Sequence, residues 1–339
     1  MVEWLPDAEL AGYELTTIPL PDEPTYDFEP AGSLVATVVR RNSPTGPRAL
    51  LYVHGWNDYF FQTHLADSVA RDGFDFYALE LRRYGRSLRG GQLAGYVAAL
   101  EDYFAEFDAA YELLRDQGYR EIVLMGHSTG GLAAVLYAHE RPGAFSAVVL
   151  NAPWIEMQGS PVLRPAAQPV FNAMSAVAST RTLVMSDGGF YARTISAALE
   201  GEWDYNPKFK GDPAFGIRIG WLKAIMAGQT RVEHGLSVDC PVLVLTAERS
   251  DFSRKWHEGL RTADVVLDVE RIASRVHRLG HHVTLVRIPD AVHDIVLSAA
   301  PARAMFFDEV SRFLGAYSRV PEPREEREEE PEAIEKVTE

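Results

Sequence analysis

The chain has 339 residues, 47% of them hydrophobic, which is enough to bury one large domain with an insertion, or two small domains, without cross-links. Its net charge of −15 and the lack of a basic stripe exclude nucleic-acid binding as a primary role. The single cysteine, Cys240, excludes an internal disulfide and favours a reducing, cytoplasmic location, while the absence of a signal-like start and of a long apolar run argues against stable membrane insertion.

Strand-like and helix-like patterns alternate along most of the chain. Eight extended segments are predicted, at Tyr13–Leu20, Ser33–Arg41, Ala49–Val53, Phe74–Leu81, Ile122–Met125, Phe145–Leu150, Val242–Leu245 and Val283–Ile288. Helical patterns lie between or after them, at Thr63–Arg71, Val97–Arg115, the segment after Ser128, Val269–Leu279 and Pro301–Leu314. This alternation predicts an α/β fold, with an eight-stranded, mostly parallel sheet and helices on both faces.

The alternation stops between Asn151 and Asp239, where helical fragments are separated by scattered proline and glycine. Because open α/β sheets bind ligands at the carboxyl ends of their strands, we predict an inserted helical lid over residues 155–238, with residues 1–154 and 239–319 as the core. Several aromatic and methionine residues could line a pocket beneath the lid: Trp154, Phe171, Met174, Phe190, Trp203, Tyr205, Phe215, Trp221 and Met226.

The last twenty residues differ in composition from the rest. Residues 320–339 contain nine acidic and three basic residues, three prolines and almost no apolar side chains. Such a segment cannot bury enough apolar surface to offset the entropy of ordering it, so it is predicted to be a disordered acidic tail.

The most informative motif surrounds Ser128. The run Gly126-His127-Ser128-Thr129-Gly130 follows an apolar strand directly and opens an Ala/Leu-rich helical pattern. A G-x-S-x-G pattern at a strand-to-helix turn is typical of a nucleophile elbow, in which the serine has a left-handed backbone and the flanking glycines allow strand and helix to touch. Ser128 is therefore the candidate nucleophile.

A serine nucleophile needs a neutral imidazole to take its proton and an acid to orient that imidazole. Of the ten histidines, only His293 follows the last predicted strand, and its loop lies at the same sheet edge as the elbow. We expect His293 to be the general base. On position alone, Glu248 and Asp251, both shortly after the strand Val242–Leu245, are candidates for the acid.

In this order of serine, acid and histidine the chain resembles the α/β-hydrolase family, most closely its monoacylglycerol-lipase-like and serine-aminopeptidase-like branch. The resemblance covers roughly Ala49–Leu314 and is carried by His54-Gly55-Trp56, the loop Ala78–Ser87, the elbow and His293. It implies an oxyanion hole made by the backbone N–H groups of Trp56 and Thr129. Asn57 stands where the family's H-G-x-G pattern has its second glycine.

The resemblance also bears on the acid. The segment Thr262–Asp268 is similar to the family's G-x-A-D-x-V-V-x-P signature, although Arg261 and Val269 replace its glycine and its proline. It implies that Asp264 is the acid, with Asp251 and then Glu248 as the alternatives. Structural roles are also open for two aspartates: Asp251 could cap a short helix, and Asp268 could be the N-cap of the next helix. An unusual insertion, Glu248–Arg261, would separate the strand from Asp264.

Taken together, these features predict a serine hydrolase that cleaves carboxylic esters through an acyl-enzyme on Ser128. Monoacylglycerol-like, lysophospholipid-like or small apolar esters are the expected substrates, and the candidate substrate contacts are His54, Trp154, Trp203 and Trp221. No cofactor and no metal are expected, and the oligomeric state is left open.

Other functions remain open on the same residues, since the fold and triad do not fix the substrate. The alternatives are a proline-iminopeptidase-like aminopeptidase, a thioesterase and a carbon–carbon bond hydrolase, and, from another class, a non-catalytic binding protein on the same fold. An aminopeptidase would need acidic lid residues to bind a substrate amine, for which the candidates are Glu156, Glu200, Glu202 and Asp204.

Overall fold

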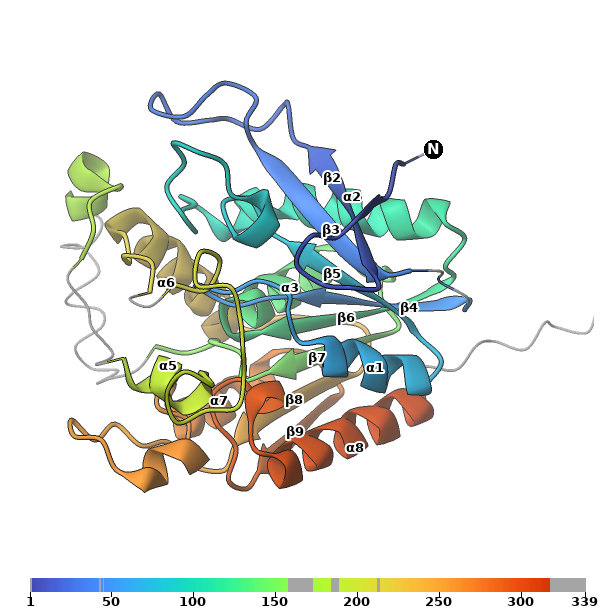
Figure 1. The fold of residues 1–339 in the computed structure, drawn as a ribbon, viewed down its shortest axis with the longest axis vertical. Helices are drawn as coiled ribbons and strands as arrows, with labels where there is room; N and C mark the ends of the chain where they lie inside the picture. Colours follow the sequence, from blue (N-terminus) through green and yellow to red (C-terminus); the bar gives the residue numbers. More distant parts are fainter. Residues whose placement is uncertain are drawn as a thin grey trace, which may run out of the picture.

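A nine-stranded sheet runs through the centre of the computed structural model, which describes residues 2–42, 44, 46–157, 173–183, 189–211 and 214–317 (Figure 1). The strands are β1 (Leu5–Pro6), β2 (Tyr13–Pro19), β3 (Val35–Arg41), β4 (Arg48–Val53), β5 (Asp75–Glu80), β6 (Glu121–His127), β7 (Ala147–Asn151), β8 (Val242–Ala247) and β9 (Val283–Ile288). Their order in the sheet is β1-β2-β3-β5-β4-β6-β7-β8-β9, and every neighbouring pair from β5 to β9 in this order is parallel.

The predicted mostly parallel sheet is confirmed, with one strand more than expected. The eight predicted strands correspond to β2 to β9, and the additional strand, β1, has only two residues and pairs with β2. Both of its residues are exposed, so no alternation of apolar and polar side chains marks it in the sequence.

Helices cover both faces of the sheet because successive side chains along each strand point to opposite sides. In β4, Leu50 and Tyr52 belong to one hydrophobic cluster and Leu51 and Val53 to another. The α-helices include α1 (Thr63–Arg71), α2 (Phe104–Asp116), α3 (Ser128–Glu140), α5 (Phe190–Ile195), α6 (Ile219–His234), α7 (Val269–Arg275) and α8 (Ala300–Tyr317). The first cluster includes residues of α1 and α8, and the second includes residues of α2, α3 and α6.

The predicted insertion follows the carboxyl end of β7, and its described part includes α5 and α6. In Figure 1 this yellow-green to yellow region lies beside the end of the sheet from which β6 and β7 continue into the elbow and the insertion. The boundaries 155–238 stay a prediction. Phe171 and the acidic tail, residues 320–339, lie outside the described residues. Within the described residues, no helix is long and apolar enough to cross a membrane.

Candidate active site

Ser128 lies at a sharp junction between β6 and α3. Its φ angle is 53°, so the predicted left-handed conformation is present. A Cβ on Gly126 would lie 2.7 Å from the Gly130 carbonyl oxygen, and a Cβ on Gly130 would overlap the carbonyl oxygen of His54. The first glycine therefore lets β6 meet α3, and the second lets α3 meet the end of β4.

The serine is the first member of a buried chain of hydrogen bonds. The Oγ of Ser128 lies 3.0 Å from Nε2 of His293, and Nδ1 of His293 lies 2.9 Å from Oδ2 of Asp264. The other oxygen of Asp264 accepts the backbone N–H groups of Val266 and Leu267 at 2.8 and 2.7 Å. A carboxylate can only accept hydrogen bonds, so the proton between Asp264 and His293 is assigned to Nδ1 of His293. The other ring nitrogen, Nε2, is then free to accept the serine proton.

Asp264 reaches this position although the chain leaves the sheet after β8. The residues between Ser250 and Asp264 form an excursion, and the chain returns to form a parallel bridge between these two residues. The N–H of Asp264 donates to the Arg249 carbonyl, and the N–H of Asp251 donates to the Asp264 carbonyl. Asp264 therefore lies beside the residues that directly follow β8, although it comes much later in the sequence.

Neither alternative acid hydrogen-bonds to His293 in the described part of the protein. The carboxylate of Asp251 accepts the N–H and hydroxyl of Ser253 and lies beside Arg249 and His257. Glu248 is exposed. Asp268 accepts the N–H groups of Glu270 and Arg271, so its predicted N-cap role at α7 is confirmed.

The backbone N–H groups of Trp56 and Thr129 are the oxyanion donors that the resemblance implies. Trp56 and Thr129 line the same cavity as Ser128 and His293. The N–H of Trp56 makes no hydrogen bond within the described part of the chain. Thr129 is the second residue of α3, and the first four N–H groups of a helix have no partner inside it. The helix dipole also favours negative charge at this end.

The cavity beside Ser128 has a volume of about 690 Å³ and a mostly apolar wall. The core contributes Trp56 and the loop 265–268 to this wall, and most of the other lining residues belong to the insertion. Four of the predicted lid side chains line it, namely Trp154, Tyr205, Phe215 and Trp221. Among the described lining residues, only Lys210 and Asp268 are of a type that carries a full charge at neutral pH.

His54 has a structural position instead of the predicted substrate contact. Its Nδ1 lies 2.8 Å from the Gly55 carbonyl and its Nε2 accepts the Leu81 N–H at 3.2 Å. Both ring nitrogens are thus used inside the protein, and the residue does not line the large cavity. Burial lowers the pKa of His54, which favours its neutral form.

Trp203 is also outside the cavity, so its predicted substrate contact is wrong. Its indole Nε1 donates to the Leu297 carbonyl at 2.7 Å, and its ring stacks on His64 with centroids 4.3 Å apart. The tryptophan therefore attaches the insertion to the core. Three further aromatic or methionine residues predicted to line the pocket do not line it: Met174, Phe190 and Met226.

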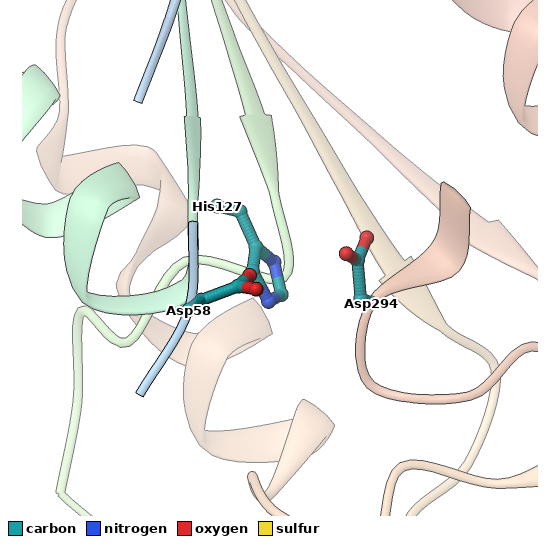
Figure 2. Close-up of side chains that lie close together, drawn as sticks. All are labelled: Asp58, His127 and Asp294. Atoms are coloured by element: carbon teal, nitrogen blue, oxygen red, sulfur yellow. The ribbon is translucent and has the colours of Figure 1, made fainter. Parts of the chain in front are cut away.

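A polar cluster lies next to the triad and was not predicted as a unit. Figure 2 shows Asp58, His127 and Asp294 converging from the loop after β4, the end of β6 and the loop after β9. One ligand atom from each lies within 4.8 Å of the others. Lys210 donates to Oδ1 of Asp58 at 2.8 Å, and Asn151 donates to Oδ1 of Asp294 at 2.6 Å. The other oxygen of Asp58, Oδ2, is buried and has no hydrogen-bond partner in the described part of the protein.

Burial and neighbouring groups shift the pKa values of two members of this cluster. Burial lowers the pKa of the His127 imidazole. Burial alone would raise the pKa of Asp294, but His127, Lys210 and the hydrogen bond from Asn151 lower it below its usual value. Asp294 is therefore an ionised, buried carboxylate that fastens the His293 loop to β7.

The acidic residues considered for binding a substrate amine do not line the cavity. Glu156 pairs with Arg275, Glu200 pairs with Arg193, and Glu202 lies 3.7 Å from Arg303. Asp204 is exposed and also lies outside the lining. These four residues therefore provide no acidic subsite for an amine in the described part of the cavity.

Sequence reasoning missed three residues at the site: Asn57, Tyr191 and Lys210. All three line the cavity. Tyr191 lies edge-on to His293 with ring centroids 5.5 Å apart, and its buried hydroxyl has no hydrogen-bond partner in the described part of the protein. Asn57 carried a sequence signal, since it departs from H-G-x-G. Lys210 and Tyr191 carried none, because neither belongs to a motif.

Residues 46–298 match the model of the family described as serine aminopeptidase, S33. The chain belongs to this family. Among curated relatives, a monoacylglycerol lipase of Mycolicibacterium smegmatis is 24% identical over 282 residues, which are 80% of this chain and 89% of that protein. The predicted resemblance to this branch of the α/β-hydrolases is thus confirmed.

Solved structures agree on the fold. A monoglyceride lipase from Saccharomyces cerevisiae aligns over 90% of this chain and 97% of its own, with a TM-score of 0.63 and 14% identity. A monoacylglycerol lipase from Paleococcus ferrophilus aligns over 79% and 94%, with a TM-score of 0.56 and 18% identity. The α/β-hydrolase fold predicted from the sequence is confirmed.

Proposed function

We propose that this protein is a serine hydrolase that cleaves carboxylic esters with apolar groups through an acyl-enzyme on Ser128. The observation that carries the proposal is the hydrogen-bonded chain from Ser128 through His293 to Asp264, which opens into a mostly apolar cavity. A family member that only binds a ligand would not need this series of hydrogen bonds.

The geometry supports the following reaction. His293 takes the proton of Ser128 as Oγ attacks the ester carbonyl, and Asp264 stabilises the imidazolium that forms. The N–H groups of Trp56 and Thr129 donate to the carbonyl oxygen as it becomes negative. His293 then gives the proton to the leaving alcohol, and a water activated by the same histidine hydrolyses the acyl-enzyme.

The cavity supports a lipid-like substrate. Its volume of about 690 Å³ lies within the range of cavities that bind small molecules, and its tryptophan-lined wall suits an alkyl chain. The similar lipases act on monoacylglycerols by name. We propose monoacylglycerol-like or lysophospholipid-like esters, or small apolar esters, as substrates. The lone cysteine, Cys240, supports a cytoplasmic location.

An aminopeptidase is the second candidate, because the matching family model carries that description. The four carboxylates considered for a substrate amine lie outside the cavity lining, which favours the ester hydrolase. Amino-acid arylamides distinguish the two functions, since only an aminopeptidase would cleave them efficiently.

The experiment compares aryl esters of graded acyl length with amino-acid arylamides, using the wild type, Ser128→Ala and Ser274→Ala. Ser274 is a matched control, because its hydroxyl only donates to the Arg271 carbonyl on α7. We expect ester hydrolysis by the wild type and the control, and a loss of at least about 10⁴-fold in the Ser128 variant. A fluorophosphonate probe should label the wild type and the control only; labelling of Ser128→Ala would contradict the assignment.

A further inference from the structure

Asn57 ties the loop that follows β4 to the insertion. Its φ angle is 52°, in the left-handed region that asparagine tolerates better than most residues. Its Nδ2 donates to the Gly211 carbonyl at 2.8 Å, and its Oδ1 accepts the N–H groups of Gly211 and Phe215 at 3.1 and 3.3 Å. Because these backbone partners comprise one acceptor and two donors, they fix the orientation of the amide.

The two following residues bind the same part of the insertion. Asp58 and Lys210 form a buried ion pair at 2.8 Å, and the Tyr59 hydroxyl accepts the Asn206 N–H at 2.7 Å. Residues 57, 58 and 59 therefore each bind a residue between 206 and 215. We call these contacts the clasp.

The clasp joins the wall of the cavity to a group that acts on the reacting carbonyl. Lys210, Gly211 and Phe215 line the cavity, and the Phe215 ring lies edge-on to Trp56 with centroids 6.1 Å apart. Trp56, directly before Asn57, carries the N–H proposed for the oxyanion hole. An oxyanion donor works only within a narrow range of distance and direction, so the loop that carries it must be held.

We propose that Asn57 is a positioning residue: by binding Gly211 and Phe215, it holds the Trp56 N–H on the oxyanion. This inference rests on the proposed ester hydrolysis. Three hydrogen bonds join the Asn57 side chain to the backbone of Gly211 and Phe215 and so hold the loop after β4 against the insertion. The Trp56 N–H itself makes no hydrogen bond to the described residues. Loss of the carboxamide frees the loop and moves this donor off the oxyanion.

Two substitutions test the proposal. Asn57→Gly allows the left-handed backbone but removes the carboxamide, and Asn57→Asp keeps an acceptor but places a carboxylate oxygen against the Gly211 carbonyl. Ser274→Ala is again the control, because this residue lies outside the clasp and its hydroxyl donates to the Arg271 carbonyl on α7. For each protein, kcat and KM are measured on the shortest aryl ester, together with the rate of fluorophosphonate labelling and the Tm.

We expect kcat and the labelling rate to fall at least about tenfold in both Asn57 variants, with KM within about threefold of wild type, and the control to be unchanged. A folded Asn57 variant with wild-type kcat overturns the proposal, as does a rise in KM alone. If only one Asn57 variant folds, that variant decides; if neither folds while the control does, the role is structural and the proposal is wrong. A wild type that neither hydrolyses esters nor reacts with the probe instead contradicts the proposed function.

Discussion

Asp264 uses its two oxygens for different tasks. One accepts two backbone N–H groups, and the other accepts the Nδ1 proton of His293. The backbone donors stabilise the ionised carboxylate and fix its plane, so the imidazole is held with Nε2 toward Ser128. An amide at this position would keep the shape but would no longer require a proton on Nδ1.

We therefore expect Asp264→Asn to lower kcat by about 10⁴-fold with a fold similar to wild type. Asp251→Asn is the matched control, since this carboxylate binds Ser253 in the same excursion and should leave kcat within about twofold. Steady-state kinetics on an aryl ester, with circular dichroism of each variant, checks the result. A larger loss in the Asp251 variant than in the Asp264 variant would assign the role of the triad acid to Asp251.

The site residues that could be predicted from the sequence depend on local motifs, whereas those that could not depend on contacts between distant parts of the sequence. Ser128, His293 and Asp264 each lie in a local motif or directly after a strand, so pattern and topology are enough to find them. Asn57 and Gly211 are 154 positions apart, and neither residue's local pattern refers to the other. His54 and Trp203 were assigned to the substrate because sequence does not distinguish a histidine or tryptophan satisfied by backbone from one that faces a cavity.

At the scale of elements, the close approach of β4, β6 and α3 leaves little room for side chains. The helix predicted at Thr63–Arg71 is found with those same bounds, because its apolar spacing alone defines it. The junction at the elbow depends instead on backbone contacts between elements. Gly130 meets the backbone of His54 and Val53 there.

A methyl group at Gly130 should separate α3 from β4. Its Cβ would overlap the His54 carbonyl, and backbone cannot move aside as a flexible side chain can, so Gly130→Ala should destabilise the protein by about 3 kcal/mol or more and lower activity. Gly315→Ala on α8 is the control: a Cβ there meets nothing within 4 Å, and the change should be neutral or slightly stabilising. Urea unfolding measures both. Equal stabilities would contradict the predicted overlap.

Across the whole molecule, buried histidines link stability to pH. Burial lowers the pKa values of His54 and His127, and that of the partly buried His64. In the unfolded chain these residues take up protons near pH 6.5, whereas in the folded protein they do so only at lower pH. The unfolded state therefore binds more protons in this interval, so stability is full above about pH 6.5 and decreases as the pH falls below it.

We expect the Tm to fall by several degrees between pH 7 and pH 5, and to fall less in His54→Gln, which cannot take up the proton. His234→Gln is the control, because this histidine is exposed and its ring binds only the Thr230 carbonyl. Thermal unfolding followed over this pH range measures the slopes. A slope for His54→Gln equal to that of the wild type would show that His54 does not contribute to the pH dependence.

The bridge between Ser250 and Asp264 has a consequence for engineering. The excursion leaves and re-enters the fold at adjacent positions, so the number of residues between these two ends does not determine where Asp264 lies. Lengthening a surface loop adds only a small entropic term, because that term grows with the logarithm of loop length. The exposed residues Ser253–Lys255 are thus a place where a reporter peptide can be inserted while the spacing of Ser128, His293 and Asp264 stays the same.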